Sequence, residues 1–248
     1  MRRIAIIGSG QAGLVCAHGL RKAGHSVTLY SDRTPEAWLS QSRPTGVAAR
    51  FWPALDYERD LGLNHWESTT AKFMGAHLTF CPVVHNRLLT CTGRMSHPGV
   101  AIDVRLQSHR WMRDLVDRGG KIEIEEVTIP KLEEIAREHD LTIVATGKGG
   151  LASLFRRNEP RSVYSEAQRN VFAVKVLANV GELILLPFHH KDEGPSWAIG
   201  WEAKPGGLMD RFENEKSAGE VLDISRKMIR ELMPWILTSG KWPISSRN

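Results

Sequence analysis

The chain has 248 residues, of which 42% are hydrophobic and 25% are charged, and its formal net charge is +5. This composition is typical of a globular protein with a real core, and the scattered basic residues, without a run or an aromatic stripe, argue against nucleic-acid binding. The three cysteines lack C-x-x-C spacing, so no zinc site or disulfide framework is expected. No stretch approaches the roughly 20 apolar residues that span a bilayer, and we expect a soluble, cytoplasmic protein without a membrane partner.

The first 33 residues have the pattern of a strand, a glycine turn, a helix and a second strand. The apolar run 4–7 is typical of a strand buried in a parallel sheet. The string G-S-G-Q-A-G follows from Gly8 to Gly13, and then a helical pattern that Gly24 closes. Residues 27–30 form the second strand. This is the context that a dinucleotide-binding fingerprint requires.

The three glycines of this string have separate physical roles in such a loop. Gly8 permits the tight turn, Gly10 lets the backbone approach a pyrophosphate, and Gly13 lets helix and strand pack closely. We expect the pyrophosphate to meet the N–H groups at the helix N-terminus, so Ser9, Gln11 and Ala12 join the predicted cofactor site. The alternative is that the glycines serve only the turn.

An acidic residue usually bonds the adenosine ribose in this motif. Its place falls near Ser31, whereas Asp32 stands one position later. We expect Asp32 to reach the ribose and Arg33 to lie against the phosphates. The equal alternative is that Asp32 and Arg33 are ordinary charged residues of a surface loop with no role in binding.

The remaining chain mixes helices and strands. After an irregular Pro- and Trp-rich stretch with a short helix at 54–61, the patterns predict two antiparallel strands within 71–95, a helix at 104–118, a strand at 121–126, a helix at 129–140 and a buried strand at 141–147. Beyond residue 160, three β-rich runs (171–180, 181–188 and 196–203) predict an antiparallel sheet, and 216–232 predicts an amphipathic helix. The fold class is α/β with added antiparallel β-sheet.

Five segments together resemble one family, the oxygenase component of two-component, FAD-dependent styrene and indole monooxygenases. They are IAIIGSGQAGL (4–14), VTLYSDRTPE (27–36), YERDLGLNHWE (57–67), AIDVRLQSHRWMRDLVDRGGK (101–121) and HDLTIVATGKGGLASLF (139–155). The YSDR and VATGKG pieces are more specific than the glycine string.

The resemblance implies a fold similar to p-hydroxybenzoate hydroxylase. Residues 1–75 and 100–158 would form the Rossmann-like FAD-binding domain, and 76–99 and 159–248 the substrate-binding domain. A separate NADH-dependent flavin reductase would supply reduced FAD, and one atom of O₂ would go to an aromatic alkene such as styrene or indole. The protein would contribute a dry cavity for this chemistry. A homodimer is a further partner to consider.

The resemblance also assigns residues one at a time. Asp32 and Arg33 match the family's S/T-D-R after the second strand, and Ala145, Thr146 and Gly147 match the turn that passes beside the cofactor. Arg105 opens the long helix where related flavin hydroxylases contact the cofactor, although a surface arginine is an equal alternative. Thr45 is the catalytic candidate, in place of an Asn-Thr pair. Trp197 and Trp201 are candidates for the substrate cavity.

Two departures keep other functions open. Family members are longer and carry a second FAD motif, a Gly-Asp string with a following proline, which does not occur here after Gly147. This predicts a natural truncation, a frameshifted product or an incomplete sequence. A catalytically impaired FAD- or nucleotide-binding fragment and an NAD(P)-dependent oxidoreductase are the alternative functions. His189 and His190 would point to opposite faces of a strand, so no metal is expected.

Overall fold

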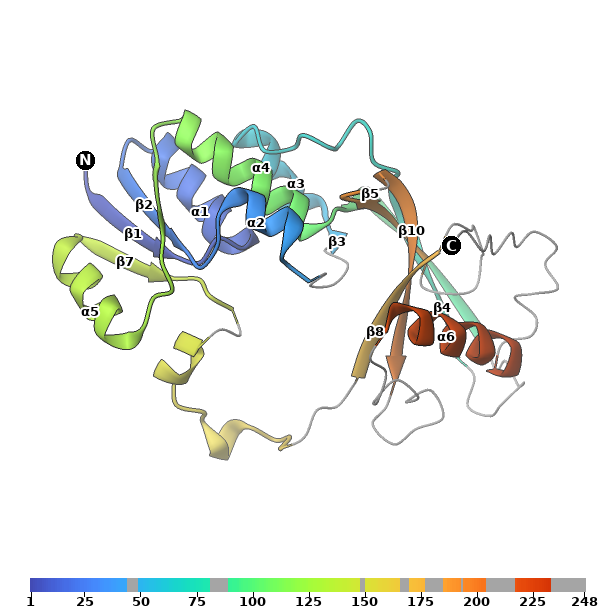
Figure 1. The fold of residues 1–248 in the computed structure, drawn as a ribbon. Helices are drawn as coiled ribbons and strands as arrows, with labels where there is room; N and C mark the ends of the chain where they lie inside the picture. Colours follow the sequence, from blue (N-terminus) through green and yellow to red (C-terminus); the bar gives the residue numbers. More distant parts are fainter. Residues whose placement is uncertain are drawn as a thin grey trace. The chain divides into compact units, whose positions relative to one another are not determined.

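A computed structural model of the chain describes residues 1–43, 49–80, 89–147, 150–165, 170–176, 185–192, 194–203 and 217–232. The chain forms two compact units, and both are discontinuous in sequence (Figure 1). Unit 1 comprises residues 1–48, 53–65 and 102–158, and unit 2 comprises 49–52, 66–101 and 159–248.

Unit 1 is built on a four-stranded parallel sheet. The strands are β1 (Arg3–Ile7), β2 (Ser26–Ser31), β6 (Lys121–Ile124) and β7 (Leu141–Val144), in the order β6-β2-β1-β7. β1 lies in the interior, parallel to β2 and to β7, and β2 is parallel to β6. The predicted Rossmann-like sheet is confirmed.

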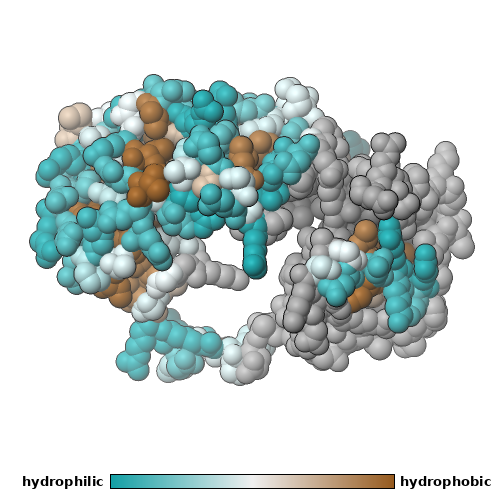
Figure 2. Space-filling model, viewed as in Figure 1, coloured by the Kyte–Doolittle hydropathy of each residue, from teal (hydrophilic) through white to brown (hydrophobic). Residues whose placement is uncertain are grey.

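Helices cover both faces of this sheet. Ile4 and Ile6 of β1 face α1 (Gln11–Lys22) and α4 (Val104–Asp117), and their cluster includes the fully buried Trp111. Because side chains alternate along a strand, Ala5 and Ile7 point to the other face, where they pack with Ile135 of α5 (Ile129–Glu138). The outer surface of unit 1 seen in Figure 2 is mainly hydrophilic, so the apolar faces of these helices are turned inward.

Two expectations for unit 1 need correction. β7 was expected to be a buried strand, but Leu141 is 50% exposed and the rest of β7 is half-buried. The reason is that β7 lies at an edge of the described sheet, which an apolar run cannot reveal.

The stretch after β2 is also more regular than expected. It contains α2 (Pro35–Ser40), which Thr34 caps by accepting a hydrogen bond from the Ala37 N–H at 3.1 Å, and α3 (Trp52–Asp60), which was expected. Thr-Pro at the N-cap and first helical position is a helix-start signal. Two short 3₁₀ helices, Gly150–Leu154 and Glu159–Arg161, follow β7.

The described residues of unit 2 form two antiparallel sheets of three strands each. One has the order β3-β5-β4, from β3 (Ala49–Arg50), β5 (Leu89–Ala101) and β4 (Phe73–Phe80). The other has the order β8-β10-β9, from β8 (Asn170–Val176), β9 (Leu185–His190) and β10 (Gly194–Ala203). The predicted antiparallel sheet beyond residue 160 is confirmed.

The last described element of unit 2 is the helix α6 (Ala218–Leu232), close to its expected bounds. Met228 and Ile229 are buried on its apolar face. Across the described residues of both units, no helix combines the length and the apolarity needed to cross a bilayer.

Candidate dinucleotide-binding site

The carboxyl ends of three parallel strands meet at the glycine loop. The Gly8 N–H donates to the Tyr30 carbonyl at the end of β2 (2.9 Å), and the Ala145 N–H donates to the Ile7 carbonyl at the end of β1 (2.8 Å). The structure therefore places the loop, the residues after β2 and the residues after β7 together at one edge of the sheet, which is where parallel α/β folds bind their ligands.

Two of the loop glycines are required by close backbone approach. Gly8 has a φ of +115°, and a Cβ there would lie 2.6 Å from the Ala145 carbonyl oxygen. A Cβ at Gly13 would lie 2.0 Å from the Gly8 carbonyl oxygen. α1 is thus packed directly on the loop, and the loop directly on the turn that contains Ala145, Thr146 and Gly147.

Gly10 differs from these two because it borders open space. It is the N-cap residue of α1, and its carbonyl accepts from the Leu14 N–H at 3.0 Å. A Cβ at Gly10 would meet nothing within 4 Å, no side chain caps α1, and no acidic residue lies in its first turn. These features fit a pyrophosphate, because the exposed N–H groups and the helix dipole both attract an anion there.

A directed chain of hydrogen bonds fixes the middle of the loop. Trp38 Nε1–H donates to Ser9 Oγ at 3.0 Å, and Ser31 Oγ donates to the Arg33 carbonyl at 2.7 Å. The two serine hydroxyls are 2.7 Å apart. Since the Ser31 proton goes to Arg33, Ser9 donates to Ser31. Both serines are buried and their hydroxyls are engaged by one another and by Trp38 and Arg33, so either serine would meet a ligand through its backbone.

Asp32 and Arg33 form an ion pair directly after β2. Arg33 Nε donates to Asp32 Oδ1 at 2.9 Å, and Nη2 bonds Oδ2. The hydrogen bonds to Asp32 raise the pKa of the Arg33 guanidinium. Arg33 Nη1 also donates to Ser42 Oγ at 2.7 Å, and the guanidinium lies over the Trp38 ring, 4.9 Å from its centroid. The exposed Asp32 carboxylate is therefore held in place with lone pairs left to accept further bonds.

Arg105 lies in the first turn of α4 and is buried against Asp103. The Asp103 carboxylate caps α4 by accepting from the Arg105 N–H at 3.0 Å, and it also binds Arg105 Nε at 2.9 Å. Two residues further, Gln107 Oε1 accepts from Gln11 Nε2 at 2.8 Å. The start of α4 is thus tied to the start of α1, while the Arg105 guanidinium is engaged by Asp103.

The remaining candidates belong to other parts of the chain. Thr45 lies outside the described residues. Trp197 and Trp201 are on β10 of unit 2, in register with Val176 and Phe172 of β8. In the described residues, no three His, Cys, Asp or Glu side chains group into a metal site.

Three residues at the site were missed from sequence. They are Trp38, Ser42 and Gln107. The Thr34-Pro35 signal could have located α2 and hence the face that carries Trp38. Nothing in the local pattern marks Ser42 or Gln107, because their partners are distant in sequence.

Comparison with known proteins agrees with this geometry. Residues 6–50 match the family model described as "NAD(P)-binding Rossmann-like domain", and residues 171–238 match the one described as "Styrene monooxygenase A putative substrate binding domain". Two curated proteins called styrene monooxygenase StyA, from Pseudomonas fluorescens and Pseudomonas sp, are each 32% identical over 168 residues. The match covers 68% of this chain, and the chain spans only 40% of the length of these relatives.

Solved structures support the fold. The flavin-dependent halogenase CmlS has a TM-score of 0.58 at 18% identity and is matched over 94% of this chain and 47% of that chain. Halogenase PltM has a TM-score of 0.59 at 14% identity over 100% of this chain and 59% of that chain. The p-nitrophenol 4-monooxygenase PnpA from Pseudomonas putida DLL-E4 has a TM-score of 0.54 at 14% identity, and the match covers 94% of this chain and 64% of that chain.

The sequence relatives and the fold lead to one family. The parallel Rossmann-like sheet, the antiparallel sheet and the StyA similarity confirm the predicted resemblance. The chain is a styrene monooxygenase A-like protein with the fold of FAD-dependent monooxygenases, and it is shorter than StyA.

Proposed function

We propose that the chain binds FAD at the glycine loop and acts as the oxygenase of a two-component monooxygenase. A separate NADH-dependent flavin reductase would supply reduced FAD. An aromatic alkene of the styrene or indole type, O₂ and reduced FAD would then give the epoxide, water and oxidised FAD, with both electrons coming from the flavin. Reduced FAD supplies the activation of O₂; the protein supplies binding, orientation and exclusion of water.

Two observations together support this proposal: the geometry of the glycine loop and the sequence similarity to StyA. Gly8 and Gly13 are packed against backbone, whereas Gly10 leaves space beside the uncapped start of α1. A pyrophosphate needs this arrangement, and the relatives that share the sequence are called styrene monooxygenases.

Each site residue then has a proposed role. The backbone N–H groups at the start of α1 bind the pyrophosphate, Asp32 accepts from the ribose hydroxyls, and Arg33 holds Asp32 in position. The turn after β7 lies beside the cofactor. The proposed cofactor contacts are Gly8, Ser9, Gly10, Gln11, Ala12, Gly13, Ser31, Asp32, Arg33, Arg105, Ala145, Thr146 and Gly147. Thr45 remains the catalytic candidate, and Trp197 and Trp201 the cavity candidates.

Two alternative functions are compared with this proposal. The family model for residues 6–50 is described as NAD(P)-binding, which favours an NAD(P)-dependent oxidoreductase. A catalytically impaired FAD-binding protein would share the loop geometry and lack epoxidation. The three functions differ in cofactor preference and in product.

Cofactor preference is tested by calorimetric titration of the purified chain with FAD and, separately, with NADH and NADPH. We expect FAD to bind more tightly than either nicotinamide nucleotide. Tight binding of NADH or NADPH with no binding of FAD in either oxidation state would overturn the flavin assignment.

Activity is tested with a flavin reductase, NADH, FAD and styrene or indole, and the organic products are quantified by gas chromatography. We expect styrene oxide from styrene that depends on the chain and on O₂. FAD binding without any epoxide would favour the impaired alternative. A Gly10→Val variant is the matched control, since its side chain would occupy the space proposed for the pyrophosphate.

A further inference from the structure

A pocket of about 300 Å³ lies at the end of unit 1 away from the glycine loop. It is lined by His18, Arg21, Lys22, Leu61 and Arg118. α1 starts at the loop and ends at Lys22, twelve residues later, so the pocket is about 18 Å from the proposed pyrophosphate site. We propose that this pocket is a second anion site, which binds a small phosphate-bearing molecule.

Arg21, Lys22 and Arg118 place three positive charges around the pocket. The side chains of Arg21, Lys22 and Arg118 form hydrogen bonds to carbonyl oxygens and to His18. Within the described part of the chain none of the three forms an ion pair with a carboxylate. The carboxyl-terminal ends of α1 and α4 together present about one unit of negative charge. The pocket lining itself holds three cations and no carboxylate, which suits an anion.

The two guanidiniums are held before any ligand arrives. Arg118 Nη1 donates to the Leu61 carbonyl at 2.6 Å, and Nη2 donates to the Gly62 carbonyl at 3.1 Å. Arg21 Nη1 donates to the His25 carbonyl at 2.6 Å, and Nη2 to the Arg118 carbonyl at 3.0 Å. Each guanidinium has five N–H donors, so donors remain for an anion. Because the side chains are already fixed, binding costs less conformational entropy than at an ordinary surface.

Gly62 and Gly119 allow the backbone to lie beside the guanidinium groups of Arg118 and Arg21. Gly62 has a φ of +62°, and a Cβ there would lie 3.4 Å from Arg118 Nη2. Gly119 has a φ of +77°, and its Cβ would lie 3.1 Å from Arg21 Nη2. Any other residue would be strained in this conformation, so the backbone itself shapes the pocket around the charges.

His18 acts as a positioning residue at the base of the pocket. Its Nε2 lies 2.9 Å from the Trp111 carbonyl, which can only accept, so Nε2 carries the proton. Nδ1 then accepts from Arg118 Nη1 at 3.0 Å. Burial lowers the pKa of this histidine, which keeps it neutral and able to accept. Arg118 is thereby oriented without losing its charge.

The ligand class follows from charge and shape. Guanidinium groups bind phosphate oxygens through two parallel hydrogen bonds, and Lys22 adds a point charge. Lys22 Nζ uses one bond, to the Asp60 carbonyl at 2.7 Å, and so has two donors left. The volume exceeds that of a phosphate alone, and Leu61 offers an apolar contact. A phosphate monoester or a pyrophosphate ester with a small apolar part fits both features.

The test uses inorganic pyrophosphate as the probe and the full ¹⁵N-labelled chain, at constant ionic strength set with sodium chloride. We expect pyrophosphate to shift the amide resonances of Gly62 and Gly119. Shifts of Gly8 and Gly10, if the glycine loop also binds the probe, form a separate set with their own affinity. The result therefore does not depend on whether FAD binds.

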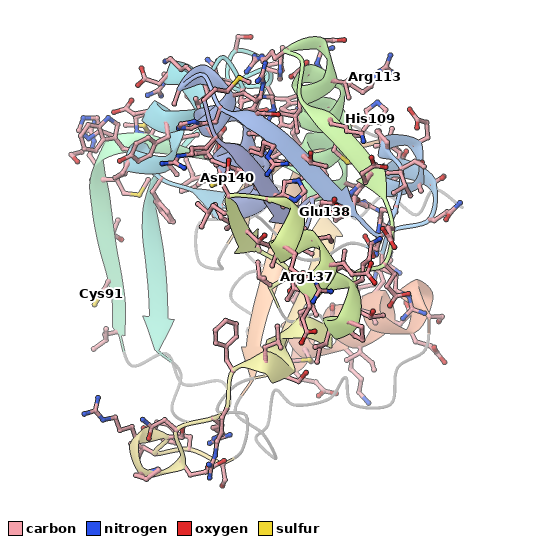
Figure 3. The ribbon with its side chains drawn as sticks, turned by 90° about the vertical axis from the view of Figure 1, so that its left-hand side faces the viewer. Cys91, His109, Arg113, Arg137, Glu138 and Asp140 are labelled. Carbon is pink, nitrogen blue, oxygen red and sulfur yellow. The ribbon has the colours of Figure 1, made fainter. Side chains whose placement is uncertain are left out.

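A matched pair of variants assigns the site. Lys22→Gln removes a cation from the pocket and is expected to weaken pyrophosphate binding at Gly62 and Gly119 about threefold to tenfold, whereas Lys22→Arg restores it. Arg113→Gln removes the same charge from α4, where Arg113 projects from the helix outside the pocket (Figure 3), and is expected to change the affinity less than about twofold.

Three outcomes would overturn the proposal. They are shifts confined to the glycine loop, equal losses in Lys22→Gln and Arg113→Gln, or the same shifts produced by sodium chloride alone.

Discussion

The indole N–H of Trp38 donates to the hydroxyl of Ser9 at 3.0 Å, which joins α2 to a loop 29 residues earlier in the chain. The Ser9 hydroxyl in turn donates to the Ser31 hydroxyl, and the Ser31 hydroxyl donates to the Arg33 carbonyl. The Trp38 ring also lies under the Arg33 guanidinium. One tryptophan therefore contacts both the proposed pyrophosphate loop and the residue that holds Asp32.

We predict that Trp38→Phe weakens FAD binding about threefold to tenfold, the loss of roughly one hydrogen bond. Phenylalanine keeps a ring for Arg33 to lie on, so the variant removes mainly the N–H donor. The affinity is measured by calorimetric titration. Trp52→Phe is the control, because Trp52 belongs to unit 2 and stacks on His97 instead. Equal FAD affinities of Trp38→Phe and the unaltered chain would show that the bond does not position the loop.

A second prediction compares two glycines of α1. Gly13→Ala should abolish FAD binding and lower stability, because its Cβ would fall 2.0 Å from the Gly8 carbonyl oxygen. Gly19→Ala should raise the free energy of unfolding by about 0.5–1 kcal/mol, because a Cβ there meets nothing within 4 Å and alanine favours a helix. Urea unfolding and FAD titration of both variants test this. A Gly13→Ala chain that is as stable and binds FAD as tightly as the unaltered one would contradict it.

A third prediction concerns pH. Burial lowers the pKa of His18 below its ordinary value, so the unfolded chain binds more protons than the folded chain between the two values. The free energy of unfolding should therefore rise with pH through this window. It should fall as the pH drops below about 6.5, the ordinary histidine value. Urea unfolding at a series of pH values from 5 to 8 measures the slope.

His18→Gln separates this effect from that of His189, whose pKa burial also lowers. The glutamine can still donate to the Trp111 carbonyl but does not titrate. The variant should lose part of the slope below pH 6.5 while keeping the slope that other groups cause. An unchanged slope would mean that protonation of His18 does not limit stability in acid.

The nucleotide unit was predictable because its signals are local. Four buried apolar residues, a glycine turn and a helical pattern within 33 residues specify β1, α1 and β2, and the structure contains each of them. The site as an assembly was not predictable in the same way. Trp38 reaches Ser9, and Gln107 reaches Gln11, through contacts 29 and 96 residues apart in sequence. No local pattern encodes such pairs.

The wrong prediction for β7 has the same origin. The apolar run of β7 fits a central strand and an edge strand equally, and only the sheet order distinguishes them. For Arg105, the position at the start of α4 is as expected, and the contact with a cofactor stays a prediction. Its engagement by Asp103 depends on the side-chain geometry of the helix cap, which spacing alone does not determine.

A last prediction follows from that buried pair. Asp103→Asn keeps an oxygen to cap α4 but leaves the Arg105 guanidinium without its carboxylate, at a site where both residues are buried. Breaking a buried ion pair on one side costs about 3 kcal/mol, and urea unfolding should show a loss of this size. The exposed Asp117, at the other end of α4, is the control, and Asp117→Asn should change stability by less than about 0.5 kcal/mol. The double variant Asp103→Asn/Arg105→Gln should recover part of the loss, because the buried guanidinium is removed together with its carboxylate. If the double variant is less stable than Asp103→Asn alone, then Arg105 stabilises the fold through other partners, and its role at the cofactor must be assigned by FAD titration of Arg105→Lys.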